Sequence, residues 1–137
     1  MQFRDLKTQY TVLKDEMDKA ILDVVASSAF VMGPKIKEME TAFAEYVGVK
    51  HCIACNSGTD ALLLALKAWD VKPGDAVFVP GFTFFASAEV IAMQGATPVF
   101  VDVDKDTFNM DVDDLERKIE QTIKAGKLTP RVVIAVD

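Results

Sequence analysis

The stretch Ala76-Val77-Phe78-Val79, followed by Pro80-Gly81, decides the fold class, because every residue before the proline is apolar. Similar strand-length segments occur at residues 98–103 and 132–136, and we predict a fourth strand over residues 51–55. Strands that are apolar on both faces are typical of parallel sheets covered by helices on both sides. The sequence therefore predicts an α/β fold with a mostly parallel sheet flanked by helices, and leaves the strand order open.

Helical periodicity fills the rest of the chain. Apolar residues spaced by three and four predict two N-terminal helices, the second beginning at Gly33-Pro34 and ending at Gly48. Their inward stripes are expected to be Tyr10, Leu13, Met17, Ile21, Val24 and Val25, and then Ile36, Met39, Phe43 and Val47. Three more helices are predicted over residues 58–69, 83–93 and 112–123, each between two strands.

Composition and charge exclude several classes of protein. The 137 residues are 50% hydrophobic and 26% charged, which is typical of a globular protein. A net charge of −6 argues against a protein that tracks nucleic-acid phosphates. The most apolar stretch, residues 76–101, is broken by proline and glycine, and no secretory signal opens the chain. We therefore expect a soluble, cytoplasmic protein.

The last predicted strand, residues 132–136, is followed at once by the final residue, Asp137. Ligand-binding loops emerge from the carboxyl ends of strands in open parallel sheets. We therefore expect the chain to be part of a longer protein.

His51, Cys52 and Cys55 form a possible metal or redox motif, because Cys-x-x-Cys can bind zinc or exchange disulfides. There is no second pair of ligands in the sequence, and we expect no metal. We interpret the two cysteines as buried free thiols in a core strand.

The segment Asn56-Ser57-Gly58-Thr59-Asp60 follows a predicted strand and opens a helix. The first amides of a helix have no partner within it, and the macrodipole adds positive charge there. Gly58 would let a ligand approach, and the Ser57 and Thr59 hydroxyls can donate to oxygen, as a phosphate site requires. The alternative is that Ser57 or Thr59 only caps the helix, and an aspartate at position 60 would oppose an anion.

The segment Pro80-Gly81-Phe82-Thr83-Phe84-Phe85 also lies between a strand and a helix. Its aromatic rings could stack on a planar heterocycle, or all three could belong to the core. If this segment and the previous one share a site, a phosphate anchor and a stacking ring fit a phosphorylated aromatic cofactor.

Aspartates at positions 102, 104, 106, 111, 113 and 114 suggest calcium, but the EF-hand pattern fails, since Thr107 stands where the loop needs glycine. We predict a solvated turn followed by a helix cap at Asp111. No nucleophilic triad is visible either, because His51 is the only histidine.

Taken together and in order, six stretches resemble the N-terminal part of the DegT/StrS-type sugar aminotransferases, pyridoxal-phosphate enzymes of the aspartate aminotransferase fold (fold type I). They are Phe3-Arg4-Asp5-Leu6-Lys7, Val31-Met32-Gly33-Pro34, residues 56–62, Pro73-Gly74-Asp75, residues 80–84 and residues 95–102. By this resemblance, residues 1–137 are an N-terminal segment plus part of the large cofactor-binding domain, whose C-terminal remainder is absent.

The resemblance implies roles for individual residues. Gly58 and Thr59 match the residues that hold the phosphate of pyridoxal 5'-phosphate, and Phe84 matches the aromatic that stacks on its pyridine ring. Gly33-Pro34 is similar to a stretch near the active site at the dimer interface, and residues 3–7 to a segment of the sugar-nucleotide pocket. The Schiff-base lysine and the aspartate that pairs with the pyridinium nitrogen would both lie beyond residue 137, so these residues contain no catalytic lysine.

The function implied is a transaminase that passes an amino group, usually from glutamate, to a nucleotide-linked keto sugar in polysaccharide or glycan synthesis. The resemblance also implies a homodimer in the complete protein, and the 137 residues alone should be inactive. Two alternatives stay open: a dehydratase of the same family, with histidine in place of the lysine, or a non-catalytic α/β domain that binds a phosphorylated ligand.

Overall fold

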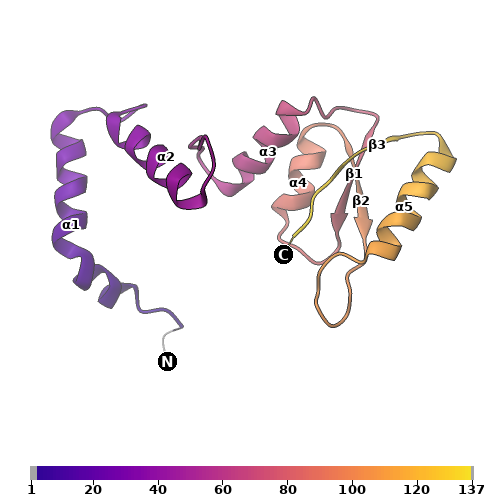
Figure 1. The fold of residues 1–137 in the computed structure, drawn as a ribbon, viewed down its shortest axis with the longest axis horizontal. Coiled ribbons are helices and arrows are strands. Elements are labelled where there is room, and N and C mark those ends of the chain that lie inside the picture. Colours follow the sequence, from indigo (N-terminus) through magenta and orange to yellow (C-terminus); the bar gives the residue numbers. More distant parts are fainter. Residues whose placement is uncertain (1–2, 137) are drawn as a thin grey trace. The chain divides into compact units, whose positions relative to one another are not determined.

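Three parallel strands form the sheet, in the order β2-β1-β3 (Figure 1). The structure is a computed structural model that describes residues 3–136. The strands are β1 (Asp75–Pro80), β2 (Thr97–Val101) and β3 (Thr129–Val133). Ala76 of β1 is in register with Thr97 of β2, and Asp75 is in register with Thr129 of β3. The predicted parallel α/β fold is thereby confirmed.

The chain divides into two compact units. Residues up to Ala54 hold helices α1 (Leu6–Ser27) and α2 (Pro34–Val47). Residues from Cys55 onward hold the sheet and helices α3 (Gly58–Ala68), α4 (Ala86–Met93) and α5 (Val112–Ala125).

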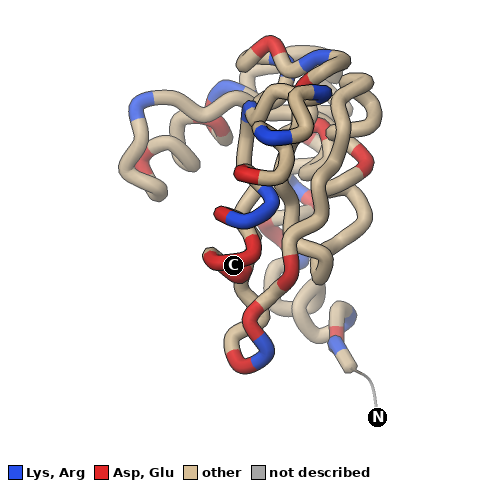
Figure 2. The backbone as a smooth tube through the Cα atoms, turned by 90° about the vertical axis from the view of Figure 1, so that its right-hand side faces the viewer, with Lys and Arg blue, Asp and Glu red and all other residues tan. Residues whose placement is uncertain are grey.

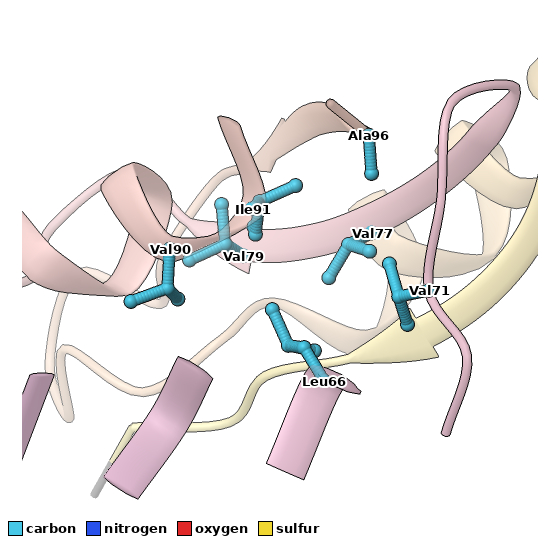
Figure 3. Close-up of a cluster of buried hydrophobic side chains, with 7 residues drawn as sticks. All are labelled: Leu66, Val71, Val77, Val79, Val90, Ile91 and Ala96. Atoms are coloured by element: carbon cyan, nitrogen blue, oxygen red, sulfur yellow. The ribbon is translucent and has the colours of Figure 1, made fainter. Parts of the chain in front are cut away.

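The central strand β1 is buried along its whole length because helices cover both faces of the sheet. Val77 and Val79 pack with Leu66 of α3 and with Val90 and Ile91 of α4 (Figure 3). The alternate residues of β1, Ala76 and Phe78, belong to a second cluster, against which Leu115 and Ile119 of α5 pack. Each buried aliphatic or aromatic side chain contributes about 1.5–3 kcal/mol, so this strand organises the unit.

Helix α3 runs antiparallel to the strands, on the same face of the sheet as α4 (Figure 1). Trp69 caps the carboxyl end of α3, and its carbonyl accepts a hydrogen bond of 3.0 Å from Arg131 near the start of β3. The amino end of α3, at Gly58, therefore lies toward the end of the sheet at which β1 finishes. Helix α4 also begins at that end of the sheet, after the turn that follows Pro80.

The strand predicted over residues 51–55 is wrong, since these residues have no regular secondary structure. Both edges of β1 are already paired, with β2 and with β3, so no place beside the central strand is left for a further strand. The Ala54 amide instead donates to the Glu40 carboxylate of α2, at 3.0 Å. An apolar run is compatible with a strand, but it does not supply a neighbour with an unpaired edge.

Other boundaries differ by a few residues. The helix predicted from residue 83 begins at Ala86, because residues 81–85 form a turn, and β2 ends at Val101, two residues before the predicted end. The last strand, β3, covers residues 129–133 instead of 132–136. Its polar start at Thr129-Pro130-Arg131 reads as a loop, but Pro130 is tolerated because β3 is an edge strand of the described sheet and a register shift lies there.

Helices α1 and α2 confirm the two predicted N-terminal helices. The Asp5 carboxylate caps α1 by accepting from the Thr8 amide at 3.0 Å, and Gly48 caps α2 in the left-handed region. Neither helix has a fully buried residue, so the stripes expected to face inward are partly or largely exposed in the described chain. Among residues 3–136, no helix combines the length and the apolar character that crossing a membrane requires.

Candidate functional site

Ser57 caps helix α3. Capping was one of the two roles predicted for this segment, and anion binding was the other. Its backbone is extended, its Oγ accepts from the Asp60 amide at 3.1 Å, and its carbonyl accepts from the Ala61 amide at 3.0 Å. One side chain and one carbonyl therefore satisfy the donors at the third and fourth positions of the helix.

Three donors remain free at the start of α3. Within residues 3–136, the amides of Gly58 and Thr59 and the hydroxyl of Thr59 have no hydrogen-bond partner. The positive end of the helix macrodipole acts at the same place. Capping by Ser57 and binding of an anion are therefore compatible, because they use different groups.

The space around Gly58 is open. A Cβ built at this position meets no other atom within 4 Å among the described residues, and its backbone is outside the left-handed region. Neither packing nor backbone conformation in this structure therefore requires glycine here. Close approach of a ligand to the backbone is another physical reason for glycine at this position.

The turn after β1 exposes its aromatic side chains. Phe84 is 79% exposed, and Phe82 and Phe85 are 66% and 72% exposed, so the alternative that all three belong to the core is wrong for the described chain. The turn itself is anchored, since the Gly81 amide donates to the Val101 carbonyl at 2.8 Å.

A pair of hydroxyls joins this turn to α4, and no motif in the sequence pointed to it. Thr83 Oγ1 and the buried Ser87 Oγ are 2.9 Å apart and share a hydrogen bond. The spacing of four residues at the start of a helix is the signal that could have found it. The hydroxyl pair ties the turn to α4, while Phe84 between them faces solvent.

The structure brings the two predicted segments to the same end of the sheet, where the strands finish, and to the same face of the sheet. Helices α3 and α4 share a hydrophobic cluster, and both begin at the end of the sheet where β1 ends. Gly58 and Thr59 lie at the start of α3, and Phe84 lies two residues before α4. A set of free amide donors and an exposed ring therefore occupy neighbouring elements.

The acidic residues after β2 serve the fold. Asp104 Oδ1 accepts from Thr107 and from the Asp106 amide, and these hydrogen bonds, first of all from the Thr107 backbone, lower the pKa of Asp104. Asp111 caps α5 by accepting from the Asp113 and Asp114 amides, which confirms the predicted cap. In residues 3–136 no group of three histidine, cysteine or acidic side chains is arranged to hold a metal ion.

The interpretation of Cys52 and Cys55 as buried core thiols is wrong. Both are free, but Cys52 is half-buried and Cys55 is exposed, because residues 51–55 do not join the sheet. The Cys55 thiol donates to the Ser57 carbonyl at 3.3 Å, so it lies beside the cap of α3.

A hollow lies at the other end of α3. It has a volume of about 580 Å³ and is lined by Trp69, Asp70 and Arg131, among others. It lies at the carboxyl end of α3, so it is separate from the free donors at the helix start.

Comparison with known proteins identifies the family. Residues 11–136 match the DegT/DnrJ/EryC1/StrS aminotransferase family. The UDP-2-acetamido-2-deoxy-3-oxo-D-glucuronate aminotransferase of Pseudomonas aeruginosa is 44% identical over 125 residues, which are 91% of this chain and 35% of that protein. The UDP-N-acetyl-3-dehydro-alpha-D-glucosamine 3-aminotransferase of Acidithiobacillus ferrooxidans is 42% identical over 121 residues, 88% of this chain and 33% of that protein. The chain thus spans about a third of the length of these relatives.

Solved structures agree with this assignment. A DegT DnrJ EryC1 StrS aminotransferase from Brucella abortus superposes with a TM-score of 0.96 at 50% identity, over all of this chain and 37% of that chain. A Streptococcus pneumoniae structure in its pyridoxal-phosphate form has a TM-score of 0.70 at 44% identity, over 72% of this chain and 25% of that chain.

The sheet and its covering helices match part of the fold of fold-type-I pyridoxal-phosphate aminotransferases. The chain belongs to the DegT/DnrJ/EryC1/StrS aminotransferase family, whose members depend on pyridoxal phosphate. The resemblance seen in the sequence is confirmed.

Proposed function

We propose that residues 1–137 are the N-terminal portion of a pyridoxal-phosphate-dependent transaminase that aminates a nucleotide-linked keto sugar for glycan synthesis. The observation that carries this proposal is the pair of unpartnered amides at Gly58 and Thr59, which adjoin open space. They lie at the same end of the sheet as the exposed Phe84. The relatives named above are nucleotide-sugar aminotransferases, which supports the same activity.

The phosphate end of the cofactor fits the start of α3. The amides of Gly58 and Thr59 and the Thr59 hydroxyl would donate to its oxygens, and the helix macrodipole would stabilise its charge. The open space at Gly58 would allow the oxygens to approach the backbone closely.

The aromatic end of the cofactor fits Phe84. A ring that is 79% exposed and follows an anchored turn is available to stack on a pyridine ring. Phe84 would thereby hold the plane of the cofactor in one orientation, which a lone phosphate anchor cannot do.

When bound, pyridoxal phosphate acts as an electron sink for the amino-group transfer. The lysine that carries it and the aspartate at its pyridinium nitrogen would come from beyond residue 137 of a longer polypeptide. The 137 residues alone are therefore expected to position the cofactor without catalysing turnover.

The names of the two relatives favour a UDP-linked 3-keto sugar as the amino acceptor, because both act at the 3-position of such a sugar. We propose glutamate as the donor. The test uses the complete polypeptide that carries these residues, with pyridoxal phosphate, glutamate and a UDP-linked 3-keto-N-acetylglucosamine. Formation of 2-oxoglutarate in equal amount to the amino sugar is expected.

Loss of water from the sugar without consumption of glutamate would instead indicate a dehydratase. Neither 2-oxoglutarate nor a dehydrated sugar, despite bound cofactor, would contradict the proposal for this substrate class. The relatives named here are aminotransferases and so do not favour the dehydratase.

We also propose that the complete enzyme is a cytoplasmic homodimer. The apolar stripe of α1 supports a dimer, since Met17 and Ile21 are 43% and 57% exposed in the described chain. Light scattering of the purified complete polypeptide tests the dimer, and cell fractionation tests the location.

A further inference from the structure

Residues 102–111, here called the acidic loop, project beyond the end of β2, at the same end of the sheet as the candidate site (Figure 1). Charged residues mark this loop in Figure 2. An antiparallel bridge joins Val103 to Met110, and the Asp111 amide donates to the Asp102 carbonyl at 2.9 Å. The loop is thus a closed, hydrogen-bonded structure.

Phe108 stands at the tip of the acidic loop in a costly conformation. Its φ is +60°, in the left-handed region that bulky residues rarely adopt. Its amide donates to the Asp104 carbonyl at 2.8 Å, and this backbone bond needs no aromatic side chain. Asparagine or glycine would adopt this backbone with less strain.

The Phe108 ring contacts the turn that carries Phe84. Its centroid is 5.4 Å from that of Phe82, and the two rings are tilted by 39°, a favourable aromatic arrangement. The acidic loop is thereby linked to the turn two residues before Phe84.

Three successive residues of the turn are each held by a different element. Gly81 is bonded to Val101 of β2, Phe82 packs on Phe108, and Thr83 is bonded to Ser87 of α4. Phe84, the next residue, is the one left exposed. A turn fixed on three sides presents its fourth side chain in a defined direction.

We propose that Phe108 is a positioning residue for the cofactor site: by packing on Phe82 it fixes the turn that presents Phe84. This inference rests on the proposed function, in which Phe84 stacks on pyridoxal phosphate. Phe108 itself does not touch the cofactor in this proposal.

The test measures the dissociation constant of pyridoxal phosphate and the visible circular dichroism of the bound cofactor in the complete polypeptide. Phe108→Asn removes the ring while suiting the left-handed backbone, so its unfolding temperature should not fall. We expect the dissociation constant to rise about 2- to 10-fold, the range of an aromatic pair, with a weaker dichroism band. Phe108→Tyr, which keeps the ring, should restore both.

Val112→Asn is the matched control, because it makes the same kind of change at an exposed apolar residue next to the acidic loop. It should alter neither the affinity nor the dichroism. Phe82→Leu removes the aromatic pair from the other side and should reproduce the effect of Phe108→Asn, which keeps the test valid if one variant folds poorly.

Phe84→Ala separates this inference from the proposed function. If Phe84→Ala leaves the affinity unchanged, the stacking role of Phe84 fails. If Phe84→Ala weakens binding and Phe108→Asn does not, only the inference is overturned. It is also overturned if Phe108→Asn weakens binding equally in the Phe84→Ala background, since Phe108 would then act without Phe84.

Discussion

Gly33 and Gly58 both stand at the start of a helix, but they are glycines for different reasons. A Cβ at Gly33 would lie 2.2 Å from the Ala29 carbonyl oxygen, whereas a Cβ at Gly58 meets no described atom within 4 Å. The fold of the first unit therefore needs glycine at position 33, while the fold of the second does not need it at position 58.

Gly58→Ala should separate folding from cofactor binding. We expect stability of the complete polypeptide without cofactor to stay the same or rise by up to about 1 kcal/mol, because alanine favours helix. The dissociation constant of pyridoxal phosphate should rise about tenfold or more, equivalent to about 1.4 kcal/mol. Thermal unfolding and a cofactor titration measure the two effects.

Gly33→Ala is the control for this prediction. Its methyl group collides with backbone, and overpacking of this kind costs about 1–3 kcal/mol. A Gly58→Ala variant that loses stability and keeps its affinity would mean that Gly58 serves the fold.

Thr59 offers a hydroxyl as well as an amide, and the two can be tested apart. Thr59→Ala should weaken binding of pyridoxal phosphate by about 1.5–3 kcal/mol, the value of a hydrogen bond to a charged group. Thr59→Ser keeps the hydroxyl and should retain most of the affinity. If the unmodified protein, Thr59→Ala and Thr59→Ser bind pyridoxal phosphate equally well, the Thr59 hydroxyl is not a phosphate ligand.

At the scale of elements, Asp114 joins β2 to α5. Its buried carboxylate accepts from the Asp102 amide at 2.7 Å through Oδ2 and from Arg117 through Oδ1. The Asp102 hydrogen bond, followed by the positive charge of Arg117, lowers the pKa of Asp114 despite its burial. The ionised form therefore stabilises the junction at which the acidic loop begins.

The sign of the pH effect follows from this direction. A carboxyl whose pKa is lowered by folding stabilises the protein above its unfolded pKa of about 3.9, and the contribution is lost as the pH falls through the folded value. Asp114→Asn should be less stable than the unmodified protein at pH 7, and the difference should shrink toward pH 3. Urea unfolding of the complete polypeptide across that range measures it.

Asp113→Asn is a suitable comparison, since it removes a negative charge from the exposed side of the same helical turn. A difference between Asp114→Asn and the unmodified protein that is the same at pH 7 and pH 3 would contradict the assigned role of the carboxylate.

At the scale of the whole molecule, helices α1 and α2 bury no residue completely within the described chain. The stripe of α1 keeps helical spacing although nothing described covers it, so a further protein surface is expected there. We attribute that surface to the second subunit of the proposed homodimer.

Ile21→Lys should weaken this dimer at least about tenfold, because it places a charge in the apolar stripe. Val12→Lys is the control, since Val12 is 78% exposed and lies on the opposite face of α1. Light scattering over a dilution series of the complete polypeptide gives both dissociation constants. An Ile21→Lys protein that dimerises as tightly as Val12→Lys would place the interface elsewhere.

Local pattern was enough to predict the fold class and the start of α3. Burial on both faces of the sheet made residues 76–79 of β1 apolar, and the hydroxyl residues between a predicted strand and a predicted helix indicated a cap at Ser57 or Thr59, which the structure places at Ser57. The stretch at residues 51–55 was apolar in the same way, yet it is no strand. A strand depends on a partner edge, and that partner is remote in sequence.

The sequence by itself determined the alternation of strands and helices, the parallel sheet and the family, because these depend on periodicity and on short motifs. Tertiary structure alone decided the strand order, the exposure of Phe82 and Phe84, and the contact between Phe82 and Phe108. The physical reason is that burial and ring contacts depend on which distant segments meet, and a motif encodes only its immediate neighbours.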